Sequence, residues 1–214
     1  AAVRRPARMA LGYLFGAEDC GSEPLEWPLA GDLLERVGDR EAGAVAAMVG
    51  RRLNSPLASS AGRLFDAVAA LLGICDDSGY EGEAAVLLEA AAAGHPDGDP
   101  LPFQLTTVDG LWVYDPVPTL RAVLLSGEPV DVLAARFHST IAEVAARLAE
   151  RACADAGLET VCLGGGVFQN RRLTEGVLRR LTAAGLRPFA GERVPMNDAG
   201  ISYGQAVVAA ARLG

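Results

Sequence analysis

The chain of 214 residues is long enough for one large domain or two small ones, and a hydrophobic fraction of 50% supplies an ample core. Its formal net charge of -8, with 19 basic residues that are all arginine, argues against an extended nucleic-acid surface. Aromatic residues make up only 6% while alanine is abundant, so the composition favours helix-rich packing of small side chains. No apolar run reaches the length of a membrane-spanning helix, and the first residues do not resemble a signal peptide.

Four cysteines are scattered singly along apolar segments, at Cys20, Cys75, Cys153 and Cys162. None has the CxxC spacing of a zinc site or a redox motif. We therefore expect reduced thiols in the core rather than disulfides, which indicates a cytoplasmic protein.

The first hundred residues contain a series of helical patterns. Arg8–Phe15 is amphipathic, and Leu33–Val37 and Ala42–Leu53 follow a loop in which Trp27 is expected to anchor the core. The next segment, Ser59–Gly73, combines a serine cap, an apolar face and a terminal glycine, which together predict a complete helix.

Two acidic residues in this region have ordinary interpretations. Asp66 interrupts an apolar helix, and the pattern alone favours a residue on a solvated face. Glu81 lies where Tyr80–Glu83 opens the next helix, and acidic residues in a first turn commonly interact with the helix dipole. The patterns by themselves assign neither residue a function.

The chain then changes character near residue 101. Alternating residues around an Asp-Gly turn predict a β-hairpin over residues 103–114, and Thr119 is expected to cap a short helix. Pro129–Ala156 keeps one face apolar and predicts a long helix. On that helix His138 lacks a histidine partner at i+4, so we expect a buried, hydrogen-bonded side chain, whereas His95 is expected in solvent.

The last part of the chain predicts a βαβα unit. The short apolar run Val161–Leu163 is followed by Gly164-Gly165-Gly166, and Asn170 opens an amphipathic helix to Ala184. A second strand, Leu186–Phe189, precedes the turn Val194–Gly200, which opens the last helix. Both turns follow the carboxyl ends of strands, where α/β sheets usually bind ligands.

The glycine turn has two interpretations. Without Cβ atoms, the backbone can adopt a positive φ and a phosphate can approach closely, next to a helix N-terminus that favours an anion. Alternatively, the glycines only make a tight turn between strand and helix. The segment is not a P-loop, because no Gly-Lys-Ser/Thr follows, and it lacks the GxGxxG pattern.

Several motifs together resemble the hydrogenase maturation carbamoyltransferase family HypF. In order along the chain they are SSAGRLFDAVA at 59–69, YEGEAA at 80–85, RFHSTIA at 136–142, GGGVFQNR at 164–171, VPMNDAG at 194–200 and GQA at 204–206. Residues 5–12 are similar too. The GVFQNR segment separates this family from the related threonylcarbamoyl transferases, so the combination is specific.

The resemblance implies a fold, an activity and a partner. The chain is expected to be the C-terminal lobe of an actin-like (ASKHA) domain, α/β and helix-rich, with a helical segment at about 1–100 and an α/β segment at about 101–214. Complete family members use carbamoyl phosphate and ATP, through carbamoyl-adenylate, to carbamoylate the C-terminal cysteine of HypE. The resulting thiocarboxamide becomes a cyanide ligand of [NiFe]-hydrogenase. We expect the chain to be part of a larger protein whose N-terminal domains are missing, since no start methionine is present.

The resemblance also implies site residues. The nucleotide-binding set would be Gly62, Asp66, Glu81, Gly82, Gly164, Gly165, Gly166 and Asn170. Asp198 would be one ligand of a divalent metal, Fe or Zn, while Mg would accompany ATP. In the family a His-x-x-x-His pair supplies the other ligands of this metal. That pair is absent here, so the metal site is expected to be incomplete in this chain.

Two alternatives remain open at this point. One is an O-carbamoyltransferase of antibiotic biosynthesis, which shares this type of domain; the Phe168-Gln169-Asn170 segment argues against it. The other is a non-catalytic lobe that binds a nucleotide or a partner without turnover.

Overall fold

A computed structural model describes residues 4–17, 25 and 27–213, without the side chains of residues 27 and 28. The predictions for Cys20 and for the side chain of Trp27 lie outside the described residues. The chain divides into two compact units, residues 1–140 and 141–214, with the boundary inside helix α7 (Val130–Ala156). Each unit is described by itself.

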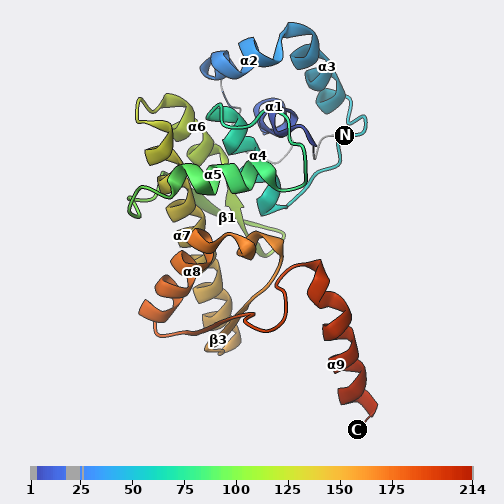
Figure 1. The fold of residues 1–214 in the computed structure, drawn as a ribbon, viewed down its shortest axis with the longest axis vertical. Coiled ribbons are helices and arrows are strands. Elements are labelled where there is room, and N and C mark those ends of the chain that lie inside the picture. The colour runs from blue at the N-terminus through green and yellow to red at the C-terminus, as the bar shows by residue number, and fades with distance from the viewer. Residues whose placement is uncertain (1–3, 18–24, 26, 214) are drawn as a thin grey trace. The chain divides into compact units, whose positions relative to one another are not determined.

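The helices predicted in the first hundred residues are present in the first unit (Figure 1). Before its hairpin it contains α1 (Pro6–Gly16), η3 (Trp27–Ala30), α2 (Gly31–Val37), α3 (Asp39–Gly50), α4 (Ala61–Leu71) and α5 (Glu83–Ala92). Helix α4 packs against α1, α5 and the later helix α6 (Val117–Leu125), and all its residues from 64 to 70 are buried. Four of these seven are alanine or valine, which lets neighbouring helices approach closely. The predicted serine cap is wrong: Ser60 precedes α4 but its side chain makes no capping hydrogen bond.

An aromatic cluster lies at the centre of this unit. The rings of Phe65 on α4 and Phe137 on α7 meet edge to face, with centroids 5.0 Å apart. His138 lies 5.2 Å from the Phe65 ring, and its Nδ1 is 2.7 Å from the carbonyl oxygen of Ala134. The prediction of a buried, hydrogen-bonded histidine is confirmed.

The hairpin is also confirmed. Strands β1 (Gln104–Val108) and β2 (Leu111–Asp115) pair antiparallel, with Val108 opposite Leu111. Asp109 and Gly110 have φ of 50° and 79°, so both central residues of the turn are left-handed, as a type I′ turn requires.

The predicted cap at Thr119 is wrong. Helix α6 begins two residues earlier, at Val117, whose N–H donates to the Asp115 carboxylate at 3.0 Å. Asp115 therefore accepts the hydrogen bond at the helix start that the sequence suggested for threonine. Thr119 is fully buried inside α6, and its hydroxyl donates to the carbonyl oxygen of Pro102 at 2.8 Å.

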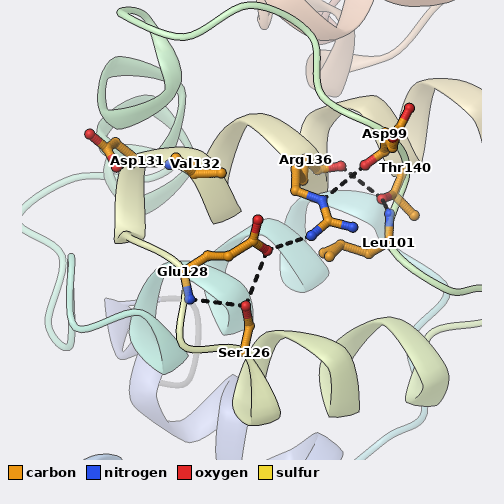
Figure 2. A network of polar contacts seen from close by, with 8 residues as sticks. All are labelled: Asp99, Leu101, Ser126, Glu128, Asp131, Val132, Arg136 and Thr140. Atoms are coloured by element: carbon orange, nitrogen blue, oxygen red, sulfur yellow. Dashed lines mark hydrogen bonds and ion pairs between the residues drawn. The ribbon is translucent and has the colours of Figure 1, made fainter.

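A polar network fixes the loop before β1 onto α7 (Figure 2). The Arg136 guanidinium donates to the carbonyl oxygen of Asp99 at 3.0 Å and pairs with the Glu128 carboxylate. One turn later, the Thr140 hydroxyl accepts the N–H of Leu101 at 2.8 Å. The backbone of the loop is thus held at two points by side chains of one helix face.

His95 is not simply solvated as expected. Its Nε2 lies 2.8 Å from the carboxylate of Asp131, near the start of α7, and its side chain is about one-third exposed. The hydrogen bond with His95 lowers the pKa of Asp131, with help from the N–H of Val132.

The second unit contains the predicted βαβα arrangement. After the second part of α7 come β3 (Thr160–Leu163), η4 (Gly166–Gln169), α8 (Arg171–Ala183), β4 (Arg187–Ala190), η5 (Asp198–Gly200) and α9 (Ile201–Leu213). Strands β3 and β4 pair parallel, with Val161 opposite Pro188. A Cβ at Gly176 would lie 3.1 Å from that of Ala142, so glycine permits the close approach of α8 to α7. Between the same helices, Arg180 donates to Glu143 at 3.0 Å.

One face of the β3–β4 sheet is not covered by any described part of the chain. Cys162 and Phe189 point to that face, because successive side chains of a strand alternate, and both are exposed. The prediction that Cys162 is a core thiol is therefore wrong, whereas Cys75 and Cys153 are buried and free. Every described residue of α9 is exposed, including Ile201 and Tyr203.

Among the residues described, none of the helices combines the length and the apolar character needed to span a bilayer.

Candidate functional site

The glycine turn after β3 is open to solvent. Gly165 has a φ of 103°, which favours glycine, and its N–H donates to the carbonyl oxygen of Met196 at 2.7 Å. A Cβ added at Gly164 or Gly165 would meet no atom within 4 Å. Unlike Gly165, Gly164 has no positive φ, so neither its backbone conformation nor packing within the described chain requires glycine there. The space above it is available to a ligand.

This turn also presents free backbone donors. Within the part of the chain that the structure describes, the N–H groups of Gly166 and Val167 donate to no acceptor. Both residues open η4, directly before α8. Exposed N–H groups grouped at a strand-to-helix turn attract an anion such as a phosphate.

Asn170 has a structural task at the start of α8. Its side-chain oxygen accepts the N–H of Leu173 at 2.8 Å, and only 9% of the residue is exposed. This is an N-cap, which satisfies one of the donors that a helix start leaves unpaired. A contact between Asn170 and a nucleotide stays a prediction.

The second turn, residues 191–200, folds tightly on itself. A Cβ at Gly200 would lie 2.3 Å from the carbonyl oxygen of Pro195, and one at Gly191 would lie 2.6 Å from that of Val194. The side chain of Asn197 accepts the N–H of Ala199 at 3.1 Å and so caps η5. Through the bond from Gly165 to Met196, this turn and the glycine turn form one structure.

Asp198 is the first residue of η5 and is exposed. The residue before it, Asn197, provides the cap of η5. Within the described residues, no three His, Cys, Asp or Glu side chains come close enough to hold a metal ion. One exposed carboxylate does not fit a divalent metal by itself, and no chemical step through a metal can be derived from this chain.

The other predicted residues lie in the first unit. Asp66 is only 2% exposed, so the interpretation as a solvated residue is wrong. Its carboxylate lies 2.8 Å from the Arg63 guanidinium, one turn earlier on α4, but the two groups are not aligned for a hydrogen bond. Burial raises the pKa of Asp66; Arg63 opposes this effect and the nearby charge of Glu81 adds to it.

Glu81 is exposed and lies one residue before Gly82. Gly82 has a φ of 85° and occupies the N-cap position of α5, a conformation that disfavours other residues. Gly62 lies in the first turn of α4, on the same helix as Asp66. The structure thus brings Asp66 and Glu81 within electrostatic reach of each other, with one glycine near each.

Two participants were missed from the sequence. Arg63 is the ion-pair partner of Asp66, and its i,i+3 spacing on a helix is a signal that could have found it. Met196 acts through its backbone carbonyl, for which side-chain identity gives no signal.

The buried carboxylate predicts an unusual pH dependence of stability. An aspartate whose folded-state pKa is raised costs stability as the pH rises from its unfolded pKa, near 4, through the folded value. Asp66→Asn cannot titrate, so we expect its stability relative to the unmodified chain, measured as the difference between their free energies of unfolding, to be greater at pH 7 than at pH 4. Urea denaturation at both pH values checks this. If the stability of Asp66→Asn relative to the unmodified chain fell from pH 4 to pH 7, the fold would instead stabilise Asp66 as an anion.

The comparisons with known proteins agree with one another. Residues 1–205 match the family model described as "Carbamoyltransferase, Kae1-like Domain, second subdomain". The chain is 44% identical to carbamoyltransferase HypF of Rhodobacter capsulatus over 167 residues, which cover 78% of this chain and 21% of the relative. It is 38% identical to a carbamoyltransferase HypF homolog of Cupriavidus necator over 220 residues, covering 98% of this chain and 53% of the relative.

The chain belongs to the HypF family. A crystal structure of full-length HypF in a phosphate- and nucleotide-bound form superimposes with a TM-score of 0.85 at 32% identity, covering 97% of this chain and 26% of that one. The HypF of T. kodakarensis gives a TM-score of 0.78 at 26% identity, covering 99% of this chain and 28% of that one. The predicted fold class, a helix-rich α/β lobe of the ASKHA type, is thereby confirmed. The chain spans between about a fifth and a half of the length of these HypF proteins.

Proposed function

We propose that this chain supplies part of the nucleotide site of a HypF carbamoyltransferase, which uses carbamoyl phosphate and ATP to carbamoylate the C-terminal cysteine of HypE. The observation that carries the proposal is the glycine turn. It combines open space at Gly164 and Gly165 with N–H groups at Gly166 and Val167 that have no acceptor among the described residues. The nucleotide and phosphate in the crystal structure of a full-length HypF support the same ligand class.

In this proposal the glycine turn binds phosphate. The N–H groups of Gly166 and Val167 donate to phosphate oxygens, and the absence of side chains at Gly164 and Gly165 lets the phosphate reach the backbone. Preorganised donors of this kind stabilise charge that develops during acyl transfer without needing to reorient. Asn170 keeps α8 starting at the correct residue.

The second set of residues, Gly62, Asp66, Glu81 and Gly82, is proposed to bind the sugar and base of the nucleotide. Carboxylate oxygens accept hydrogen bonds from ribose hydroxyls, and glycines leave room for a ring. The raised pKa of the buried Asp66 supports this assignment, because perturbed carboxyl groups concentrate at functional sites.

The chemistry of the proposed transfer is a simple exchange at the carbamoyl carbon of carbamoyl-adenylate. The HypE thiolate forms a carbon–sulfur bond, the bond from that carbon to the AMP phosphate breaks, and AMP leaves. The nucleophile belongs to the partner, so none of the cysteines of this chain needs to react. In keeping with this, Cys75 and Cys153 are buried, and burial raises the pKa of Cys75.

The proposal also includes a metal ligand and protein partners. Asp198 is the single ligand that it would contribute to a divalent metal, Fe or Zn, with the other ligands coming from outside it, and Mg would accompany ATP. HypE and the N-terminal domains of the complete protein are the proposed partners, in the cytoplasm. A net charge of -8 supports the expectation that nucleic acid is not a partner.

The test is a chimera of Rhodobacter capsulatus HypF in which this chain replaces the matching segment, called the HypF chimera below. It is incubated with carbamoyl phosphate, ATP and HypE, and the mass of HypE is measured. We expect the unmodified HypF chimera to carbamoylate HypE and Gly165→Asp to fail, because a carboxylate at that φ of 103° strains the backbone and repels phosphate. Gly127→Asp, at an open position in the first unit, is the control.

A further inference from the structure

The segment from Gly166 to Gln169 lies between β3 and α8 and belongs to neither element. It forms a single 3-10 turn, closed by the N–H of Phe168 donating to Gly165 and that of Asn170 donating to Val167, both at 3.1 Å. Short turns of this kind have few internal bonds and depend on external contacts. On one side, the contact is the bond from Gly165 to Met196.

The external contact on the other side comes from Thr174. Its hydroxyl donates to the carbonyl oxygen of Phe168 at 2.7 Å, and the residue is only 9% exposed. A threonine inside a helix usually directs its hydroxyl to the carbonyl three or four residues before it. Here the acceptor is six residues back, outside α8, so the hydroxyl joins the helix to the preceding turn.

Helix formation does not explain a threonine at this position. Threonine has a lower helix propensity than alanine or leucine, and α8 already has its cap in Asn170. What the hydroxyl adds is a fixed position for Phe168. The carbonyl that it holds lies one residue after Val167, whose N–H is one of the two donors without an acceptor among the described residues.

We propose that Thr174 is a positioning residue for the nucleotide, which fixes the N–H groups of Gly166 and Val167 through the carbonyl of Phe168. The inference rests on the proposed function of the glycine turn. In this role Thr174 acts through the backbone of Phe168 and not by contact with the nucleotide. With Met196 holding Gly165 and Thr174 holding Phe168, the two donors between them are anchored on both sides.

The test compares two substitutions of nearly equal size in the HypF chimera. Thr174→Val keeps the shape but removes the hydroxyl and leaves the Phe168 carbonyl without this donor, whereas Thr174→Ser keeps the hydroxyl. We expect Thr174→Val to weaken ATP binding about tenfold, as the loss of one buried hydrogen bond can do, and Thr174→Ser to remain within about twofold of the unmodified protein. Calorimetric titration with ATP and magnesium gives the affinities. Thr182→Val, at an exposed position late in α8, is the matched control and should bind as the unmodified protein does.

The serine variant separates positioning from general stability, because it keeps the hydroxyl but lacks the methyl group of threonine. A Thr174→Val protein with unchanged affinity, or a Thr174→Ser protein as weak as Thr174→Val, would overturn the role of Thr174. An unmodified HypF chimera that does not bind ATP at all would instead overturn the proposed function, and this inference with it.

Discussion

Phe137→Ala is expected to lower the free energy of unfolding of the first unit by about 3–5 kcal/mol, the usual cost of removing a fully buried phenylalanine. The ring is 0% exposed and meets Phe65 edge to face at 5.0 Å and His138 at 6.2 Å. Removing it would leave a cavity and also end two aromatic contacts, each with its own preferred geometry. Urea denaturation of the HypF chimera, followed by circular dichroism, measures the loss.

The control for this prediction is Leu57→Ala. Leu57 belongs to the same unit but is 74% exposed and outside any helix, so its truncation should change stability by less than about 0.5 kcal/mol. If Phe137→Ala cost no more than Leu57→Ala, the aromatic cluster would not be the centre of this core.

Gly200→Ala is expected to open the second turn. A methyl group there would lie 2.3 Å from the carbonyl oxygen of Pro195 and 3.1 Å from a methyl of Val194, and the first of these contacts involves backbone that cannot rotate away. The turn must shift, and with it the carbonyl of Met196 that holds Gly165. We expect the affinity of the HypF chimera for ATP to fall at least about tenfold, because small displacements of positioned groups have such effects.

The matched control is Gly204→Ala, four residues further along the chain. No atom lies within 4 Å of the added methyl, and alanine favours a helix interior over glycine by about 0.5–1 kcal/mol. This variant should therefore bind ATP normally. Equal affinities for Gly200→Ala and Gly204→Ala would contradict the coupling of the two turns.

Local patterns predicted most of the elements because each depends on a few neighbouring residues. The Asp109-Gly110 pair specified the hairpin, and apolar periodicity specified α7 and the βαβα unit. Asp66 could not be placed in this way. Its burial results from the packing of α1, α5 and α6 around α4, which local periodicity does not contain.

The same limit explains the other corrections. Thr119 is buried because its hydroxyl reaches Pro102, seventeen residues away, while Asp115 serves the helix start. Cys162 is exposed because one face of the β3–β4 sheet is uncovered among the described residues. For the candidate site, residue types alone left a ligand and a plain turn equally plausible at Gly164–Gly166. The specific assignment came from the resemblance to HypF.

The central claim is that this chain completes the nucleotide site of a carbamoyltransferase, and transfer to HypE tests it most directly. The mass of HypE is measured after incubation with the HypF chimera, carbamoyl phosphate and ATP, and again with each substrate omitted. The proposal predicts one added carbamoyl group, on the C-terminal cysteine, only when both substrates are present. An unchanged HypE mass, from a folded HypF chimera under conditions in which Rhodobacter capsulatus HypF modifies HypE fully, would contradict it.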